Sequence, residues 1–300
     1  GSQYAGMGKD LAENFKVAQE VFEEADEALG IKLSHLCFYG PEEDLKLTTN
    51  TQPAILTMSI AALRVLEAEK GISADFLAGH SLGEYSALVA SGALSFSEAV
   101  QTVRARGSFM QQAVPVGTGT MAAILGVEAS IIEDICREAA NGEVVSPANF
   151  NSPGQIVIAG HTSAVNRAID IAKARGFRKA MLLPVSAPFH CALMTPAGEK
   201  LAETLAQISL GDLSAPVVSN VEATPNSNRN RVKELLVRQV SAPVLWDQSI
   251  HCMVSAGVSS FIEIGPGKVL SGLVKRINKE SSVSNFEDVA SLQSIQMENR

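Results

Sequence analysis

The ten residues from Asp75 to Glu84, Asp-Phe-Leu-Ala-Gly-His-Ser-Leu-Gly-Glu, give the strongest local indication of how this chain folds. The apolar residues at their start predict a short buried strand, and the residues after Ser81 continue into a helical pattern. Between strand and helix stands Gly79-His80-Ser81-Leu82-Gly83, in which glycines on both sides of the serine permit a sharp turn. A strand, a tight turn and a helix in this order are typical of an α/β domain.

Apolar residues recur at helical spacing on both sides of this stretch. Upstream, residues 10–29 are predicted to form one helix, and a second is predicted to begin near Pro53 and to end at Lys70. Downstream, Ser95 and Glu98 have the spacing of a capping box and open a further predicted helix that carries Arg106.

The middle of the chain follows a different pattern. Strands are predicted at residues 121–125, 143–148, 155–159 and 178–183, and helices at 128–140 and 163–175. The order β-α-β-β-α-β is that of the split unit in ferredoxin-like folds.

The first pattern then resumes. Helices are predicted at 195–208, 232–240, 245–256 and 269–277, with an extended segment at 259–264. Residues 281–300 are polar and weakly patterned, which predicts a loosely held tail. We therefore predict an α/β fold whose large domain, residues 1–116 and 187–300, is interrupted by a small ferredoxin-like α+β domain, residues 117–186.

Composition and charge disfavour several classes of function. The net charge of −8 disfavours nucleic-acid binding, which needs a positive surface. Apolar runs stop well short of the roughly 20 residues that cross a bilayer, and no basic-then-apolar leader opens the chain, so we expect a cytoplasmic protein that does not bind membranes. We also expect a monomer. The four cysteines are far apart and no metal-like histidine spacing occurs, which predicts free thiols and neither a metal nor a cofactor.

Ser81 is the candidate nucleophile. The turn exposes its hydroxyl at a helix N-terminus, where amide groups and the helix dipole favour developing negative charge. The Leu82 N–H is the natural first donor to an oxyanion. The motif does not separate hydrolases from transferases, and a serine flanked by glycines also occurs by chance.

A nucleophilic serine needs a general base, usually a histidine. His80 adjoins Ser81 and is expected to be structural, because adjacent residues on such a turn rarely face each other. His190 follows a predicted strand-end loop, Pro184-Val185-Ser186-Ala187-Pro188-Phe189, and is the candidate base. The residues themselves leave open that His190 is a loop histidine hydrogen-bonded for structural reasons.

The chain resembles a known family, the malonyl-CoA:acyl carrier protein transacylases of bacterial fatty acid synthesis. It is also similar to the acyltransferase domains of polyketide synthases. The matching stretches run in order along nearly the whole chain: GSQYAGMG (1–8), GHSLGEY (79–85), RGSFMQ (106–111), NFNSPGQ (149–155), FHCALM (189–194) and EIGPG (263–267).

The resemblance implies a hydrolase-like large domain with a parallel sheet and assigns roles to matching positions. Ser81 would be the nucleophile and His190 its partner, oriented by the main-chain carbonyl of Gln239. Arg106 would hold the free carboxylate of the malonyl group, and Asn149 would lie in a loop lining the site. The expected partners are malonyl-CoA and acyl carrier protein.

One departure concerns the first residues. In the family the first strand ends in Gly-Gln-Gly-Ser-Gln, and the first Gln supplies the second oxyanion N–H. The sequence here starts within that motif at Gly1, and we expect the full protein to contain the preceding residues.

The expected reaction is a double displacement through a malonyl ester on Ser81. Phe189, next to the base, is bulky and is expected to disfavour methylmalonyl groups. Two alternatives remain open. A serine hydrolase or thioesterase would use Asp134 or Asp170 as the third catalytic group, although both lie in predicted helices of the insert. A non-catalytic carrier-protein docking module would keep the motif as a relic.

Overall fold

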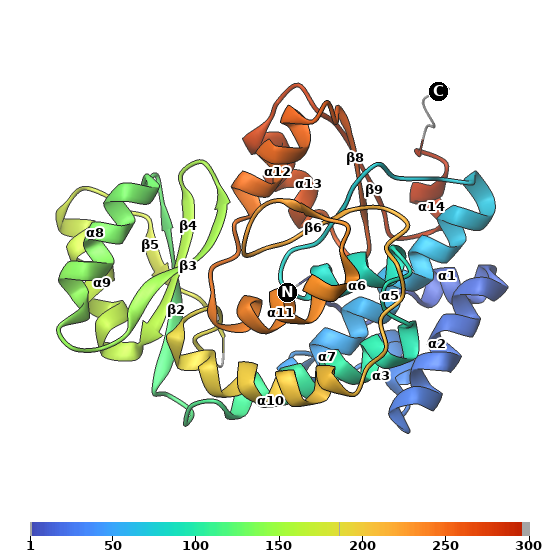
Figure 1. The fold of residues 1–300 in the computed structure, drawn as a ribbon, viewed down its shortest axis with the longest axis horizontal. Coiled ribbons are helices and arrows are strands. Elements are labelled where there is room, and N and C mark those ends of the chain that lie inside the picture. The colour runs from blue at the N-terminus through green and yellow to red at the C-terminus, as the bar shows by residue number, and fades with distance from the viewer. Residues whose placement is uncertain (1, 186, 296–300) are drawn as a thin grey trace.

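The computed structural model describes residues 2–185 and 187–295. Figure 1 shows two parts side by side. A small part contains β2 to β5 with helices α8 and α9, and a larger, mostly helical part contains everything else. Gly1, Ser186 and the last five positions of the predicted tail lie outside the described residues.

The N-terminal half of the larger part is helical. Its elements are α1 (Lys9–Asn14), α2 (Lys16–Leu29), α3 (Leu33–Tyr39), α4 (Glu42–Leu45), α5 (Thr48–Lys70), α6 (Leu82–Ala90) and α7 (Phe96–Gln112). The prediction of one helix over 10–29 is wrong, because Phe15 has an extended backbone and separates α1 from α2. The Asn14 side chain donates to the Asp10 carbonyl there and so competes with the helical bonding pattern.

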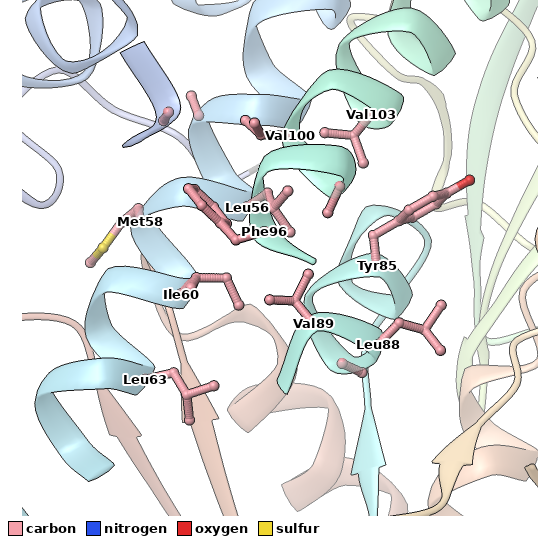
Figure 2. Packing of buried hydrophobic residues seen from close by; sticks show 14 of the residues in the cluster. Leu56, Met58, Ile60, Leu63, Tyr85, Leu88, Val89, Phe96, Val100 and Val103 are labelled. Atoms are coloured by element: carbon pink, nitrogen blue, oxygen red, sulfur yellow. The ribbon is translucent and has the colours of Figure 1, made fainter. Parts of the chain in front are cut away.

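Helix α5 forms the centre of this half. It packs against α2, α6 and α7, and it buries apolar side chains on most of its surface (Figure 2). It begins at Thr48, five residues before the predicted start, and accommodates Pro53 within its second turn. A Cβ on Gly107 of α7 would lie 2.6 Å from the Thr48 carbonyl oxygen, so glycine lets the two helices approach closely.

The small part has its own sheet and core. Its elements are β2 (Gly119–Leu125), α8 (Ala129–Ala140), β3 (Val145–Ser152), β4 (Gln155–His161), α9 (Thr162–Ala174) and β5 (Ala180–Leu182). The strands lie in the order β3-β4-β2-β5, and each pair is antiparallel. Apolar side chains from the helices and the sheet form a separate hydrophobic cluster.

The rest of the chain completes the larger part. Its elements are the short 3₁₀ turn η1 (Ala192–Met194), α10 (Thr195–Ala206), β6 (Val217–Val218), β7 (Pro225–Asn226), α11 (Arg229–Ser241), α12 (Trp246–Ser255), β8 (Ser260–Ile264), α13 (Val269–Ile277), β9 (Ser282–Phe286) and α14 (Val289–Leu292). Strand β1 (Leu77–Ala78) pairs with β6 in parallel, and β7 is antiparallel to β6. Strands β8 and β9 form a second sheet, also parallel.

The prediction of a loosely held tail is wrong for residues 282–295. Strand β9 pairs along its full length with β8, and Phe286 is completely buried. Asp288 caps α14, and Asp10 of α1 accepts a hydrogen bond from the Val289 N–H at 2.9 Å. Residues 282–295 therefore belong to the fold, and the weak sequence pattern reflects how few of their side chains are buried.

The two parts meet close to the site. The backbone of β3 bonds to the segment between α11 and α12, since Val244 donates to Ala148 and accepts from Phe150 at 2.9 Å each. Where the chain crosses between the parts, a Cβ on Gly119 would lie 2.3 Å from the Pro188 ring. No helix in the described ranges combines the length and the apolar character needed to cross a bilayer.

Candidate active site

Ser81 sits at a tight turn between β1 and α6. Its backbone has φ 52° and ψ −105°, a conformation that L-residues rarely adopt. A Cβ on Gly79 would lie 2.0 Å from the backbone of Gly83, so glycine is required there. Asn220 holds both sides of the turn, because its Oδ1 accepts from the Ser81 N–H at 2.6 Å and its Nδ2 donates to the Gly79 carbonyl at 2.8 Å.

The His190 imidazole lies against the serine hydroxyl. Its Nε2 is 2.8 Å from Ser81 Oγ, and its Nδ1 is 2.8 Å from the main-chain oxygen of Gln239. A carbonyl oxygen can only accept, so Nδ1 carries the proton and Nε2 is left as the acceptor for the hydroxyl. Burial and the nearby positive charge of Arg106 lower the pKa of His190 to about 3, which keeps the imidazole neutral and able to take a proton.

Arg106, on α7, is buried beside the same hydroxyl. Its Nη2 donates to Ser81 Oγ at 3.1 Å and to the side-chain oxygen of Gln239 at 2.9 Å, and its Nη1 donates to Gln52 Oε1 at 2.7 Å. Its Nε has no hydrogen-bond partner within the described residues. Burial lowers the pKa of Arg106, and in the described hydrogen bonds its guanidinium donates to neutral groups.

The other residues predicted for the site lie around this centre. Leu82 is the first residue of α6, where an N–H group has no partner inside the helix. Phe189 is partly buried next to the base. Asn149 is buried on β3 opposite Val244, and no hydrogen bond given for the described residues joins it to Ser81 or His190.

His80 and the two acids considered for a hydrolase lie elsewhere. His80 turns away from Ser81, and its Nε2 is 2.8 Å from Asn151 Oδ1. Asp134 pairs with Arg137 on α8 and Asp170 is exposed on α9, whereas the partner of the base is a carbonyl oxygen. This arrangement differs from the Ser-His-Asp triad of the hydrolase alternative.

Sequence reasoning missed three polar residues that hold the site together. Gln52 of α5 binds Arg106, Asn220 holds the turn, and Glu84 accepts hydrogen bonds from Gln239 Nε2 at 2.7 Å and from the Asn220 N–H at 3.1 Å. Glu84 gives the clearest sequence signal, because it stands three residues after Ser81 and is the one charged residue of α6.

Known proteins resemble this chain over nearly its whole length. Residues 1–299 match a family model described as an acyl transferase domain. A malonyl CoA-acyl carrier protein transacylase from Escherichia coli is 51% identical over 277 residues, which cover 92% of this chain and 90% of that protein. The corresponding protein from Bacillus subtilis is 50% identical over 304 residues and covers 100% of this chain and 96% of its own length.

Solved structures extend the similarity to three dimensions. An acyl carrier protein S-malonyltransferase from Vibrio cholerae superimposes with a TM-score of 0.97 at 49% identity, covering 99% of this chain and 97% of that chain. A malonyl-transacylase in complex with its type II PKS acyl-carrier protein superimposes with a TM-score of 0.95 at 47% identity, covering 98% and 95% of the two chains.

Proposed function

The chain belongs to the acyl transferase family, and we propose that it carries a malonyl group from malonyl-CoA to acyl carrier protein for fatty acid synthesis, through an ester on Ser81. The observation that carries this proposal is the pair of contacts at one hydroxyl. Ser81 Oγ meets the His190 Nε2 at 2.8 Å and the Arg106 Nη2 at 3.1 Å, so a base and a fixed cation both face the reacting atom.

In the first half-reaction, Ser81 Oγ attacks the thioester carbonyl carbon while His190 Nε2 takes the hydroxyl proton. The carbonyl oxygen becomes negative and accepts a hydrogen bond from the Leu82 N–H at the start of α6. The carbon–sulfur bond then breaks, and His190 returns the proton to the sulfur of CoA. A malonyl ester remains on Ser81.

In the second half-reaction, the phosphopantetheine thiol of the carrier protein gives its proton to His190 and attacks the ester carbonyl. The bond from carbon to Ser81 Oγ breaks, and the oxygen recovers the proton from His190. The Gln239 carbonyl keeps the imidazole in the same tautomer through both halves, because it holds the proton on Nδ1.

Arg106 explains a preference for malonyl groups. A guanidinium offers two parallel N–H donors that match a carboxylate, and a hydrogen bond to a charged group contributes about 1.5–3 kcal/mol. That range corresponds to about ten- to a hundredfold discrimination against acetyl groups. Phe189 crowds an α-methyl branch, and Asn149 lines the site from β3.

A thioesterase is the second candidate, since it would use the same turn and base. The buried cation beside the hydroxyl favours a dicarboxylic thioester over a lipid ester. Comparing the rate of malonyl-CoA hydrolysis with the rate of transfer to a thiol separates the two functions.

We further propose that the larger part is a hydrolase-like domain, residues 1–116 and 187–300, and that residues 117–186 form a ferredoxin-like domain. Support comes from the parallel pairs β1–β6 and β8–β9 in the former, and from the antiparallel order β3-β4-β2-β5 under two helices in the latter. A cytoplasmic location is supported by four cysteines that carry free thiols.

The intact mass of the protein after incubation with malonyl-CoA tests the function. The wild-type protein is expected to gain the mass of one malonyl group and to lose it again when holo acyl carrier protein is added. Ser81→Ala is expected to gain no mass, because the ester oxygen is missing. A malonyl adduct that persists on Ser81→Ala contradicts the assignment of the nucleophile.

A further inference from the structure

Glu84 is a buried carboxylate that the reaction itself does not use. It is the third residue of α6 and only 3% exposed. A glutamate at this helix position commonly reaches back to the N–H of the N-cap residue, here Ser81. Asn220 Oδ1 already accepts from that N–H, and Glu84 turns instead toward the Asn220 N–H and the side chain of Gln239.

The Gln239 side chain links this carboxylate to Arg106. Its Nε2 donates to Glu84 at 2.7 Å and to the Ser81 carbonyl at 2.9 Å, while its Oε1 accepts from Arg106 Nη2 at 2.9 Å. The amide dipole thus presents its positive end to the anion and its negative end to the cation. One neutral group carries the electrostatic coupling between two buried charges of opposite sign.

Few other charges act on Glu84. Burial raises its pKa to about 7, and the hydrogen bonds from Gln239 and Asn220 and the positive charge of Arg106 lower it by less. Tyr85, the next residue on α6, is buried with its pKa raised and stays neutral. The low pKa of His190 keeps the imidazole neutral as well. Arg106 is therefore the principal charge that Glu84 senses.

We propose that Glu84 is a positioning residue which, through the Gln239 amide, sets how strongly Arg106 attracts the malonyl carboxylate; this rests on the proposed function of Arg106. In the ionised state Glu84 offsets part of the guanidinium charge. A bound malonyl carboxylate adds a second anion to the cluster and so favours the protonated state of Glu84. Malonyl preference then declines as pH rises and Glu84 ionises.

The test compares kcat/KM for malonyl-CoA and acetyl-CoA between pH 6 and pH 8.5. The malonyl carboxylate stays ionised throughout, and the titration of CoA itself cancels in the ratio. The wild-type malonyl-to-acetyl ratio is expected to fall about tenfold over this range, the size expected for two charges roughly 12 Å apart at an effective dielectric constant near 20. A merely structural role for Glu84 would not produce this pH step.

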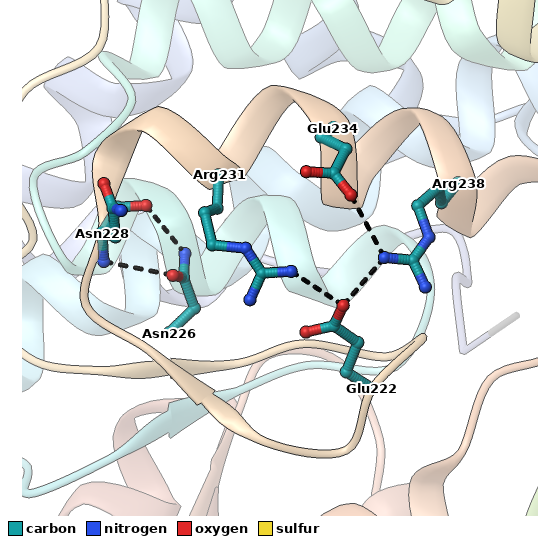
Figure 3. A network of polar contacts seen from close by, with 6 residues as sticks. All are labelled: Glu222, Asn226, Asn228, Arg231, Glu234 and Arg238. Carbon is teal, nitrogen blue, oxygen red and sulfur yellow. Dashed lines mark hydrogen bonds and ion pairs between the residues drawn. The ribbon is translucent and has the colours of Figure 1, made fainter.

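Glu84→Gln keeps an oxygen that can accept from Gln239 and Asn220 but removes the charge. At pH 8.5 its ratio is expected to exceed the wild-type ratio about tenfold and to vary little with pH. Glu222→Gln is the matched control, because Glu222 lies two residues after Asn220 and forms its ion pairs with Arg231 and Arg238 (Figure 3). It is expected to follow the wild-type profile.

Several outcomes overturn the proposal. A wild-type ratio that is flat between pH 6 and 8.5 does so without any variant, and so does a Glu84→Gln profile that matches the wild type. Arg106→Ala separates this failure from failure of the proposed function. If Arg106→Ala keeps the wild-type malonyl preference, the role of Arg106 itself is wrong; if it loses that preference while Glu84→Gln changes nothing, the role of Glu84 alone is wrong.

Discussion

The two glycines that flank His80-Ser81-Leu82 are expected to respond to alanine in opposite ways. A Cβ on Gly79 would lie 2.0 Å from the backbone carbon and oxygen of Gly83, where ordinary contacts are 3.4–4 Å. The first turn of α6 would have to retreat by about 1.4 Å, which weakens the hydrogen bonds that Asn220 makes to Ser81 and Gly79. The neighbouring atoms are backbone and cannot rotate away, so Gly79→Ala is expected to cost about 3 kcal/mol or more of unfolding free energy.

Gly83→Ala is the internal control. A Cβ at this position meets no heavy atom within 4 Å, and Gly83 is the second residue of α6. Alanine is favoured over glycine in a helix by up to about 1 kcal/mol, so this variant is expected to be as stable as the wild type or slightly more stable.

Urea denaturation curves of the two variants and the wild type measure the difference. The mass gained from malonyl-CoA reports whether Ser81 still reacts, and it is expected to be lost in Gly79→Ala and kept in Gly83→Ala. Equal stability of the two variants, or a Gly79→Ala protein that still forms the ester at the wild-type rate, would refute this account of the turn.

Two further predictions concern pH. Burial raises the pKa of Glu84 from 4.5 to about 7, so its favourable contribution to stability is present below pH 4.5 and is lost as the pH rises through 7. Relative to Glu84→Gln, the unfolding free energy of the wild type should therefore fall by about 3 kcal/mol between pH 4.5 and 8. Urea denaturation midpoints that change equally with pH in the two proteins would contradict this prediction. Because the pKa of His190 is lowered to about 3, the rate of Ser81 acylation by acetyl-CoA should stay level from pH 8 to 5, and a loss of rate centred near pH 6.5 would indicate an ordinary histidine.

The elements that the sequence predicted well are those set by local patterns. The turn around Ser81 and the six elements between residues 119 and 182 follow from glycine placement and from the change in hydrophobic period, both of which act over a few residues. Helix α13 matches its predicted bounds, 269–277. The error at β9 arose because a contact distant in sequence decides there, and no local pattern reveals its pairing with β8.

The candidate site shows the same difference between residues found from a local motif and residues placed by contacts distant in sequence. Ser81 and Leu82 could be found from one motif, whereas the residues alone left His190 undecided, because 109 positions separate it from the serine that it contacts. Arg106 and Gln239 were assigned by family resemblance. Nothing in a helical pattern distinguishes an arginine exposed to solvent from one that is 2% exposed, and the structure shows that difference.

The polar shell around Arg106 accounts for both the burial of the cation and its use. Removing a guanidinium from water is costly unless its donors are satisfied, and Gln52, Gln239 and Ser81 satisfy only Nη1 and Nη2. The buried Nε–H has no acceptor among the described residues, which itself costs about 1–3 kcal/mol. In the proposed function the malonyl carboxylate can accept from Nε, and from Nη2 where it takes the place of the Ser81 hydroxyl as acceptor. A dicarboxylic acyl group therefore removes the cost of the unpaired Nε–H, whereas an acetyl group leaves Nε without an acceptor.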